Sequence, residues 1–157
     1  MSAPLSLPGL TQFLSRLEDY PRLLEAVDQG KQTIALSGLS AVHRAYLAAA
    51  LHQSTGRPLT LVCPDDGEAR RLAGDLSALT GAEVPVLPAF LFHPGAASRQ
   101  WEHQRLEILA RLHRGDCPVL VATVEGLLQR TMPPAVFAAS CRQLHVGQVC
   151  QPEGLTD

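Results

Sequence analysis

Residues 38–45 carry the residue types that come closest to phosphate chemistry in this sequence. They read Gly-Leu-Ser-Ala-Val-His-Arg-Ala, between an apolar run at 33–36 and an alanine-rich segment over 41–53. A loop that holds nucleotide phosphates has the pattern G-x-x-x-x-G-K-[ST]. In that pattern the glycines let the backbone approach the phosphates, the lysine contacts them, and the hydroxyl ligates magnesium. Gly38 matches the first glycine of the pattern.

The other positions of this motif depart from the pattern. His43 replaces the second glycine, and its β-carbon obstructs both the phosphate and the backbone angles that the loop needs. Arg44 keeps the positive charge but presents a planar fork, and Ala45 cannot ligate magnesium. We therefore predict a degenerate, non-hydrolysing P-loop over Gly38, Ser40, His43, Arg44 and Ala45. The alternative is an unusual anion site that uses Arg44 at the start of the helix.

A second group of residues could contact nucleic acid or a partner. Arg99, Trp101 and Arg105 fall in a helix expected after residue 98, where an aromatic ring between arginines could meet a single strand. A core tryptophan flanked by solvated arginines is the more common arrangement. The formal charge of −2 also argues against strong non-specific binding to nucleic acid, which usually accompanies a basic surplus.

The remaining candidates for catalysis or metal binding predict no site. Asp65 and Asp66 fit a helix cap and first turn better than a catalytic carboxylate pair. His93, His103 and His113 recur every ten residues, which does not place them on one helix face. The four cysteines lack paired zinc-site spacing and suggest buried, reduced thiols. We expect no catalytic residue, no metal and no cofactor.

Helices and strands that would position these residues alternate along the chain after residue 30. Residues 1–30 are expected to be helical, with a restart at Pro21 and an end at Gly30. Apolar runs predict strands at 33–36, 59–63, 84–87, 118–122 and 142–149. Continuous apolar strands separated by helices indicate a parallel sheet covered on both faces. The predicted fold is therefore an open, doubly wound, mainly parallel α/β layer of the P-loop NTPase (RecA-like) kind.

Two of the expected helices have a clear buried stripe. The helix after the 59–63 strand begins with a D-x-x-E capping box, Asp65 with Glu68, and ends at Gly81. The buried face of the helix after residue 98 should carry Trp101, Ile108, Leu109 and Leu112. No apolar stretch is long enough to cross a bilayer and the N-terminus lacks a signal-peptide pattern, so we expect a cytoplasmic chain without a membrane partner.

Several blocks of the sequence resemble the bacterial transcription-repair coupling factor (Mfd) family, in the module of that family that is similar to the repair protein excinuclease B. The matching blocks are Leu-Ser-Gly-Leu-Ser at 36–40, Leu-Val-Cys-Pro-Asp at 61–65, Leu-Pro-Ala at 87–89, and the strand and helix at 119–130 before Pro133 and Pro134. The block at 119–130, with its T-V-x-x-L-L-Q-R pattern, is the most specific to the family. The resemblance covers residues 30–157.

The resemblance implies a role in DNA repair. Members of the family recognise RNA polymerase stalled at DNA damage, displace it with an ATP-dependent, helicase-like DNA translocase, and recruit the protein excinuclease A for nucleotide excision repair. The module in question has lost its ATP site. It also lacks the long damage-clamping hairpin of excinuclease B, which agrees with the short loop at 88–97.

This resemblance implies three parts in the chain. Residues 1–30 would form an N-terminal helical segment, residues 31–140 an α/β domain similar to domain 1a of excinuclease B, and residues 141–157 the cut start of a following domain. The expected function is a non-catalytic scaffold in transcription-coupled repair. It would bind excinuclease A weakly or not at all, because the expected contact surface lies beyond residue 157. The alternatives are a phosphate-binding domain that uses Arg44 or a DNA-binding helicase-like module.

Overall fold

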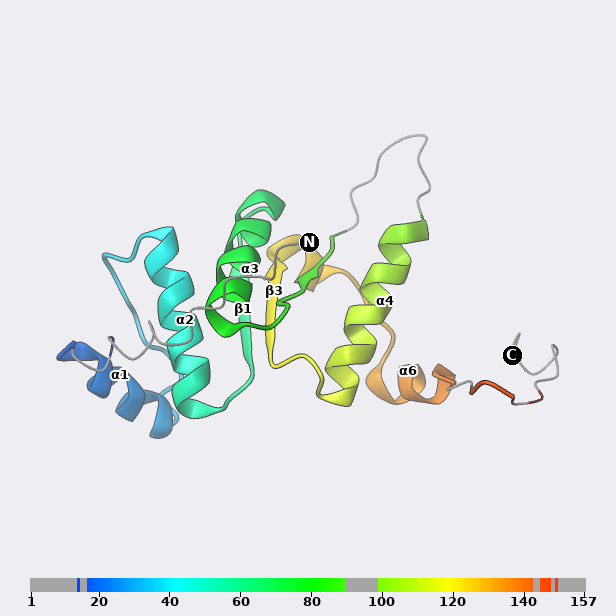
Figure 1. The fold of residues 1–157 in the computed structure, drawn as a ribbon, viewed down its shortest axis with the longest axis horizontal. Coiled ribbons are helices and arrows are strands. Elements are labelled where there is room, and N and C mark those ends of the chain that lie inside the picture. Colours follow the sequence, from blue (N-terminus) through cyan, green and yellow to red (C-terminus); the bar gives the residue numbers. More distant parts are fainter. Residues whose placement is uncertain (1–13, 15–16, 90–98, 143–144, 148, 150–157) are drawn as a thin grey trace.

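Helices and parallel strands alternate through the central part of the chain. The computed structural model describes residues 14, 17–89, 99–142, 145–147 and 149. Its elements, in chain order, are α1 (Asp19–Asp28), α2 (Ala41–Thr55), β1 (Leu59–Cys63), α3 (Asp66–Thr80), β2 (Val86–Leu87), α4 (Arg99–Arg114), β3 (Val119–Thr123), α5 (Val124–Leu128) and α6 (Pro134–Ser140). The sheet lies in the middle of the molecule, with α1 and α2 at one end and α4 and α6 at the other (Figure 1).

The sheet is parallel and has the strand order β1-β3-β2. All five residues of β3 are buried, as expected of a strand with a neighbour on each side and helices on both faces. The α3 connection runs from β1 past β3 to β2, and α4 then leads back to β3. Steps in opposite directions place right-handed crossovers on opposite faces of a sheet. The predicted mixed α/β fold with a parallel sheet is confirmed for these three strands.

Alternate residues of β3 supply the two cores. Val119 and Val121 belong to a cluster with alanines of α2 and with Ala69, Ala73 and Leu76 of α3. Leu120 and Ala122 face the other way and pack with Ile108 of α4 and with Leu87 and Cys117. Small side chains along α2 and α3 let the two helices approach closely, and Leu76 is fully buried between them and the sheet. Burial of such a leucine stabilises the fold by roughly 1.5–3 kcal/mol.

α1 adds a third, smaller cluster against the outer side of α2. Tyr20 and Leu23 pack on Ala50, and the Tyr20 hydroxyl lies 2.9 Å from Ser54 Oγ. Pro21 is tolerated because it falls in the first turn of this helix, where its missing N–H has no helical partner. The predicted end at Gly30 is confirmed, since Gly30 adopts a φ of +69° after the last turn. Residues 1–13, 15 and 16 of the predicted helix lie outside the described residues, and Leu17 and Glu18 form a bend and a turn before α1, so the prediction of a helix is wrong for these two residues.

The strand predicted at 33–36 is wrong. These residues form no strand, and Ile34 and Leu36 are 36% and 51% exposed. A short apolar run cannot by itself distinguish a strand from an extended connection. Here the run leads from the end of α1 to the start of α2, and β1 has a strand neighbour only in β3 among the described residues. The loop at 38–45 therefore does not follow a strand of the sheet.

Other boundaries differ by a few residues, and one predicted element is not found. Strand β2 is shorter than the run at 84–87, since it covers only Val86–Leu87. Of the strand predicted at 142–149, residues 142, 145–147 and 149 form no strand, and Val146 and Val149 are fully or almost fully exposed. Residues 143, 144 and 148 and most of the loop at 88–97 lie outside the described residues. Within the described helices, none is long and apolar enough to cross a membrane.

Candidate functional site

The carboxyl ends of the three strands meet at one edge of the sheet. Cys63 at the end of β1 is in register with Thr123 at the end of β3, and Leu87 of β2 is in register with Ala122. Ligands of open parallel sheets bind beyond this edge, at the loops that leave the strands. The start of α3 therefore lies at the place where a ligand of such a fold would be held.

The segment predicted to be a degenerate P-loop, residues 38–45, leads into α2 beside this edge. Ser40 is the N-cap residue of α2, and its Oγ accepts a hydrogen bond of 3.4 Å from the His43 backbone N–H and lies 3.1 Å from His43 Nδ1. Gly38 has a φ of +76°, a conformation that a residue with a side chain adopts only with strain. Ser40 Oγ and the His43 ring thus bond to each other at the helix start, where a phosphate would need backbone N–H groups.

Arg44, in the position of the P-loop lysine, pairs with a carboxylate of the chain itself. Its Nη2 lies 2.8 Å from Glu68 Oε1, which joins the first turn of α2 to the first turn of α3. The capping box is only half formed, because Asp65 Oδ1 accepts from the Glu68 backbone N–H at 2.8 Å while the Glu68 carboxylate turns to Arg44. A phosphate bound by Arg44 would have to displace Glu68. Ala45 is fully buried in the core and offers no ligand.

Cys63 lies beneath this ion pair. Its thiol is 3% exposed, and burial raises its pKa; Glu68 and Asp65 raise it further, while Arg44 opposes them. Burial also raises the pKa of Cys117, against the effect of Arg111. Because the thiolate is the reactive form, both buried thiols are poor nucleophiles at neutral pH. The prediction of buried thiols is confirmed for Cys63 and Cys117, which gives neither a catalytic role, but it is wrong for Cys141, which is exposed; Cys150 lies outside the described residues.

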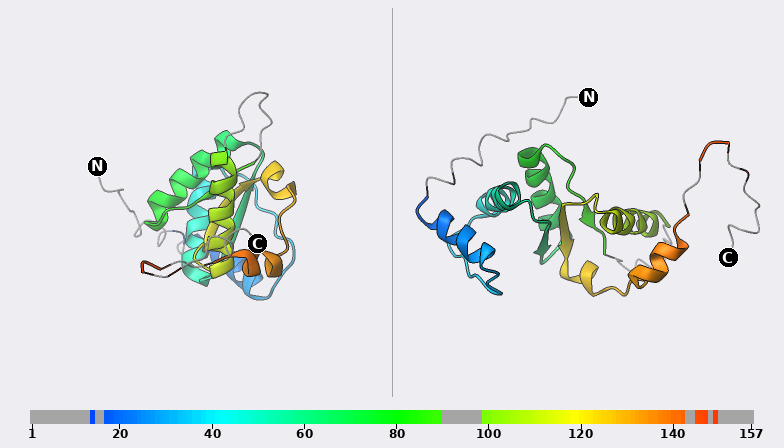
Figure 2. Two further views of the ribbon diagram at one scale, coloured as in Figure 1. Left: turned by 90° about the vertical axis from the view of Figure 1, so that its right-hand side faces the viewer. Right: turned by 90° about the horizontal axis from the view of Figure 1, so that it is seen from below.

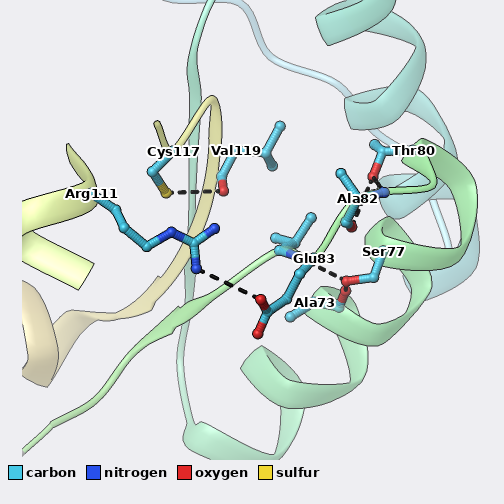
Figure 3. A network of polar contacts seen from close by, with 9 residues as sticks. Ala73, Ser77, Thr80, Ala82, Glu83, Arg111, Cys117 and Val119 are labelled. Atoms are coloured by element: carbon cyan, nitrogen blue, oxygen red, sulfur yellow. Dashed lines mark hydrogen bonds and ion pairs between the residues drawn. The ribbon is translucent and has the colours of Figure 1, made fainter. Parts of the chain in front are cut away.

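The polar contacts at the opposite edge of the sheet are structural. Ser77 Oγ donates to the Ala73 carbonyl at 2.7 Å and accepts from the Val84 N–H at 3.0 Å, which fixes the chain entering β2 on α3 (Figure 3). Arg111 Nη1 lies 3.8 Å from Glu83 Oε2 and links α4 to the same segment. Among the described residues, no group of three histidine, cysteine or acidic side chains could hold a metal ion. His93 lies outside them.

The arginine and tryptophan group on α4 is not arranged as predicted. Arg105 is only 6% exposed, so the prediction that it is solvated is wrong. Its Nη1 donates to the Pro88 carbonyl at 3.0 Å and its Nη2 to the Gln129 carbonyl at 3.4 Å. Trp101 is half-buried. Arg99 begins the helix, but its side chain lies outside what the structure describes.

The buried position of Arg105 could have been found from the sequence. Trp101, Arg105 and Ile108 have the spacing of one helix face, so the arginine falls on the stripe that the two apolar residues define. Burial lowers the pKa of Arg105, but an arginine stays protonated at any physiological pH. Leu112 is predicted to be buried on the same face, but it is 36% exposed. Of the described residues of α4, Ile108 is the one that belongs to the buried cluster against the sheet. A nucleic-acid surface that needs the Arg105 guanidinium is not supported by this arrangement.

Comparison with known proteins shows similarity to one kind of protein. The chain is 25% identical over 153 residues, or 95% of its length, to a transcription-repair-coupling factor of Bacillus subtilis (strain 168), and 32% identical over 131 residues, or 74% of its length, to one of Myxococcus xanthus. It spans 13% and 11% of the length of these relatives. No family model and no solved structure matches. The resemblance predicted from the sequence is confirmed by these relatives.

Replacing Arg105 with methionine tests whether the buried guanidinium supports the fold. Arg105→Met keeps much of the side-chain volume but leaves the Pro88 and Gln129 carbonyls without their donor. We expect the free energy of unfolding, measured by urea denaturation, to fall by about 1–3 kcal/mol. Arg114→Met is the matched control on the same helix, because Arg114 is 59% exposed, and it should change stability by less than about 0.5 kcal/mol. Equal effects of the two substitutions would contradict the role given to Arg105.

The raised pKa values of Cys63 and Cys117 predict a loss of stability at alkaline pH. A thiol whose pKa is higher in the folded state binds its proton more tightly there, so its contribution is full below the unfolded pKa of about 8.5 and disappears as pH rises through the folded value. In a Cys141→Ser, Cys150→Ser background, urea unfolding should show lower stability at about pH 9.5 than at about pH 7.5. Adding Cys63→Ala and Cys117→Ala should flatten this dependence. An unchanged slope in that variant would assign the loss to other groups.

Proposed function

From its similarity to transcription-repair-coupling factors, we propose that this chain is a non-catalytic part of such a factor. It is a scaffold that supports the recruitment of nucleotide excision repair to stalled RNA polymerase. The observation that carries the proposal is the match to the Bacillus subtilis factor, which extends over nearly the whole chain. The factor as a whole would be the cytoplasmic, ATP-dependent DNA translocase of the family. RNA polymerase and excinuclease A would be partners of that whole protein.

The loop at 38–45 supports the non-catalytic part of the proposal. Three features work against nucleotide binding there: the missing strand before the loop, the hydrogen-bonded pair of Ser40 and His43, and the ion pair between Arg44 and Glu68. Each takes away something that a P-loop needs, namely a rigid strand, open backbone N–H groups or an available cation. The loop fits a degenerate P-loop whose nucleotide function has been lost.

A phosphate-binding domain is the second candidate, and one observation favours it. Arg44 is 52% exposed, so a dianion in solution can reach its guanidinium. The cost is the ion pair with Glu68, which at this exposure contributes no more than about 1 kcal/mol. A DNA-binding module has less support, since Arg105 is buried against backbone carbonyls.

Calorimetry with magnesium-ATP separates the first two candidates. We expect no heat of binding and no phosphate release at millimolar nucleotide, because the loop lacks both a magnesium ligand and an open phosphate cradle. The Arg44→Ala variant is the control. Saturable heat of binding with the natural chain that disappears in Arg44→Ala would favour a phosphate-binding domain over the scaffold. Stimulated turnover of ATP would exclude a non-catalytic role.

Binding to excinuclease A tests whether this chain supports the recruiting surface without forming it. A scaffold that supports the contact surface without forming it should give weak or no binding when excinuclease A is titrated with the 157-residue chain. The measurement is the dissociation constant by surface capture at moderate salt. A tight complex that is weakened by substitutions on α4 or α6 would show that the recruiting surface lies in this chain, contrary to the proposal.

A further inference from the structure

A groove of about 640 Å³ lies between α4 and the connection that leads from α5 to α6. Its walls include Trp101, Arg105 and Leu106 of α4, Arg130 and Met132 of the connection, and Phe137 of α6. These elements lie side by side at the end of the molecule away from α1 and α2 (Figures 1 and 2). The groove is thus separate from the edge of the sheet that holds Arg44 and Glu68.

Several apolar side chains in and near this groove are exposed. Leu106, Met132 and Val136 are each 50% exposed, and Leu128 of α5 is 78% exposed. None of the seven residues of α6 is buried, although Phe137 contacts α4 through an edge-on ring contact with His113 at 6.4 Å. A helix this short is not stable in water on its own. A groove beside such a helix that is lined by exposed apolar side chains is typical of a site that another polypeptide covers.

The charged side chains that line the groove indicate what kind of polypeptide would bind there. Arg105 is buried in the wall with two backbone carbonyls as its partners, and no carboxylate of the described residues forms an ion pair with it or with the exposed Arg130. Glu102 is the acidic side chain of the lining, against these two arginines. A buried cation without a counter-charge is costly, and a carboxylate that reaches it lowers that cost. The lining therefore favours an acidic occupant.

We propose that this groove binds an amphipathic helix of a partner protein, with apolar side chains against Leu106, Met132 and Phe137 and a carboxylate directed to Arg105 and Arg130. A helix that lays its apolar face into a groove between helices is a recurrent mode of recognition, in which two or three anchors supply most of the affinity. The carboxylate fixes the orientation of the helix. This site lies apart from the scaffold role proposed above and does not depend on it.

A displayed library of helix-favouring peptides of about 16 residues tests the groove directly, since such a helix is about 24 Å long. Selection on the 157-residue chain should enrich peptides that carry Glu or Asp three or four positions from Leu or Phe. The dissociation constant of a selected peptide, labelled with fluorescein, is then measured by anisotropy at low and high salt. A matched control peptide, in which Glu is changed to Gln and Asp to Asn, should bind about tenfold more weakly, which is a difference of about 1.4 kcal/mol in the free energy of binding.

Surface variants locate the binding without risking the fold. Arg130→Glu and Met132→Asp change exposed residues and should each weaken binding at least tenfold, as expected for groups that contact the anchors. Arg22→Glu is the matched control for charge, because Arg22 is 82% exposed on α1, and it should leave the dissociation constant unchanged.

Three results would overturn the proposal. The first is that no peptide is enriched, or that the enriched peptides lack acidic residues. The second is that Arg130→Glu and Arg22→Glu have the same effect on binding. The third is that sedimentation shows a dimer of the natural chain that Arg130→Glu dissociates, because the occupant of the groove would then be a second copy of this chain.

Discussion

Burial of β3 on both faces is the constraint on which the rest of the structure depends. A strand with neighbours on each side and helices above and below is apolar along its length, as Val119 to Ala122 are, and the polar residue that ends β3, Thr123, uses its hydroxyl to cap α5. Their alternation sends two side chains to the α2 and α3 core and two to the α4 core. Both cores are therefore organised by this one strand.

At the carboxyl edge of the sheet, the chain satisfies its own charges. Arg44 and Glu68 neutralise each other across the starts of α2 and α3, Asp65 caps α3, and the thiol of Cys63 remains protonated beneath them. These contacts stabilise the region where a nucleotide-binding fold would keep its ligand groups open. The edge is consistent with the role proposed for the chain.

The α4 end of the molecule differs in the partners of its buried cation. Its cation Arg105 lies in a half-apolar wall, and its last helix, α6, has no buried side chain. Met132, which lines the groove, and Val136 of α6 are each 50% exposed. At the carboxyl edge of the sheet the Arg44 guanidinium is paired with the Glu68 carboxylate, whereas the Arg105 guanidinium at this end has only backbone carbonyls as partners. The contrast between the two places is why the groove, and not the degenerate loop, is proposed to receive a partner.

Local signals in the sequence determined most of the elements and their ends. Glycines at 56 and 81 adopt positive φ where the α2 and α3 helices stop, Ser40 and Asp65 cap their starts, and the apolar runs at 59–63 and 118–122 become adjacent parallel strands. These features depend on a few neighbouring residues, so spacing alone reveals them. The departures of residues 38–45 from the P-loop pattern are equally local, and so is the resemblance to the coupling factors that the relatives confirm.

Only the tertiary structure decided which partners each element meets. The run at 33–36 reads like a strand but becomes an exposed connection, because a strand needs hydrogen bonds from a neighbour that its sequence does not specify. Helical spacing places Arg105 on the apolar stripe of α4, but only the fold brings the Pro88 and Gln129 carbonyls from distant segments to its guanidinium. The pairing of Arg44 with Glu68 likewise joins residues 24 positions apart. The sequence determined local geometry, whereas contacts between distant segments decided burial, charge compensation and the groove.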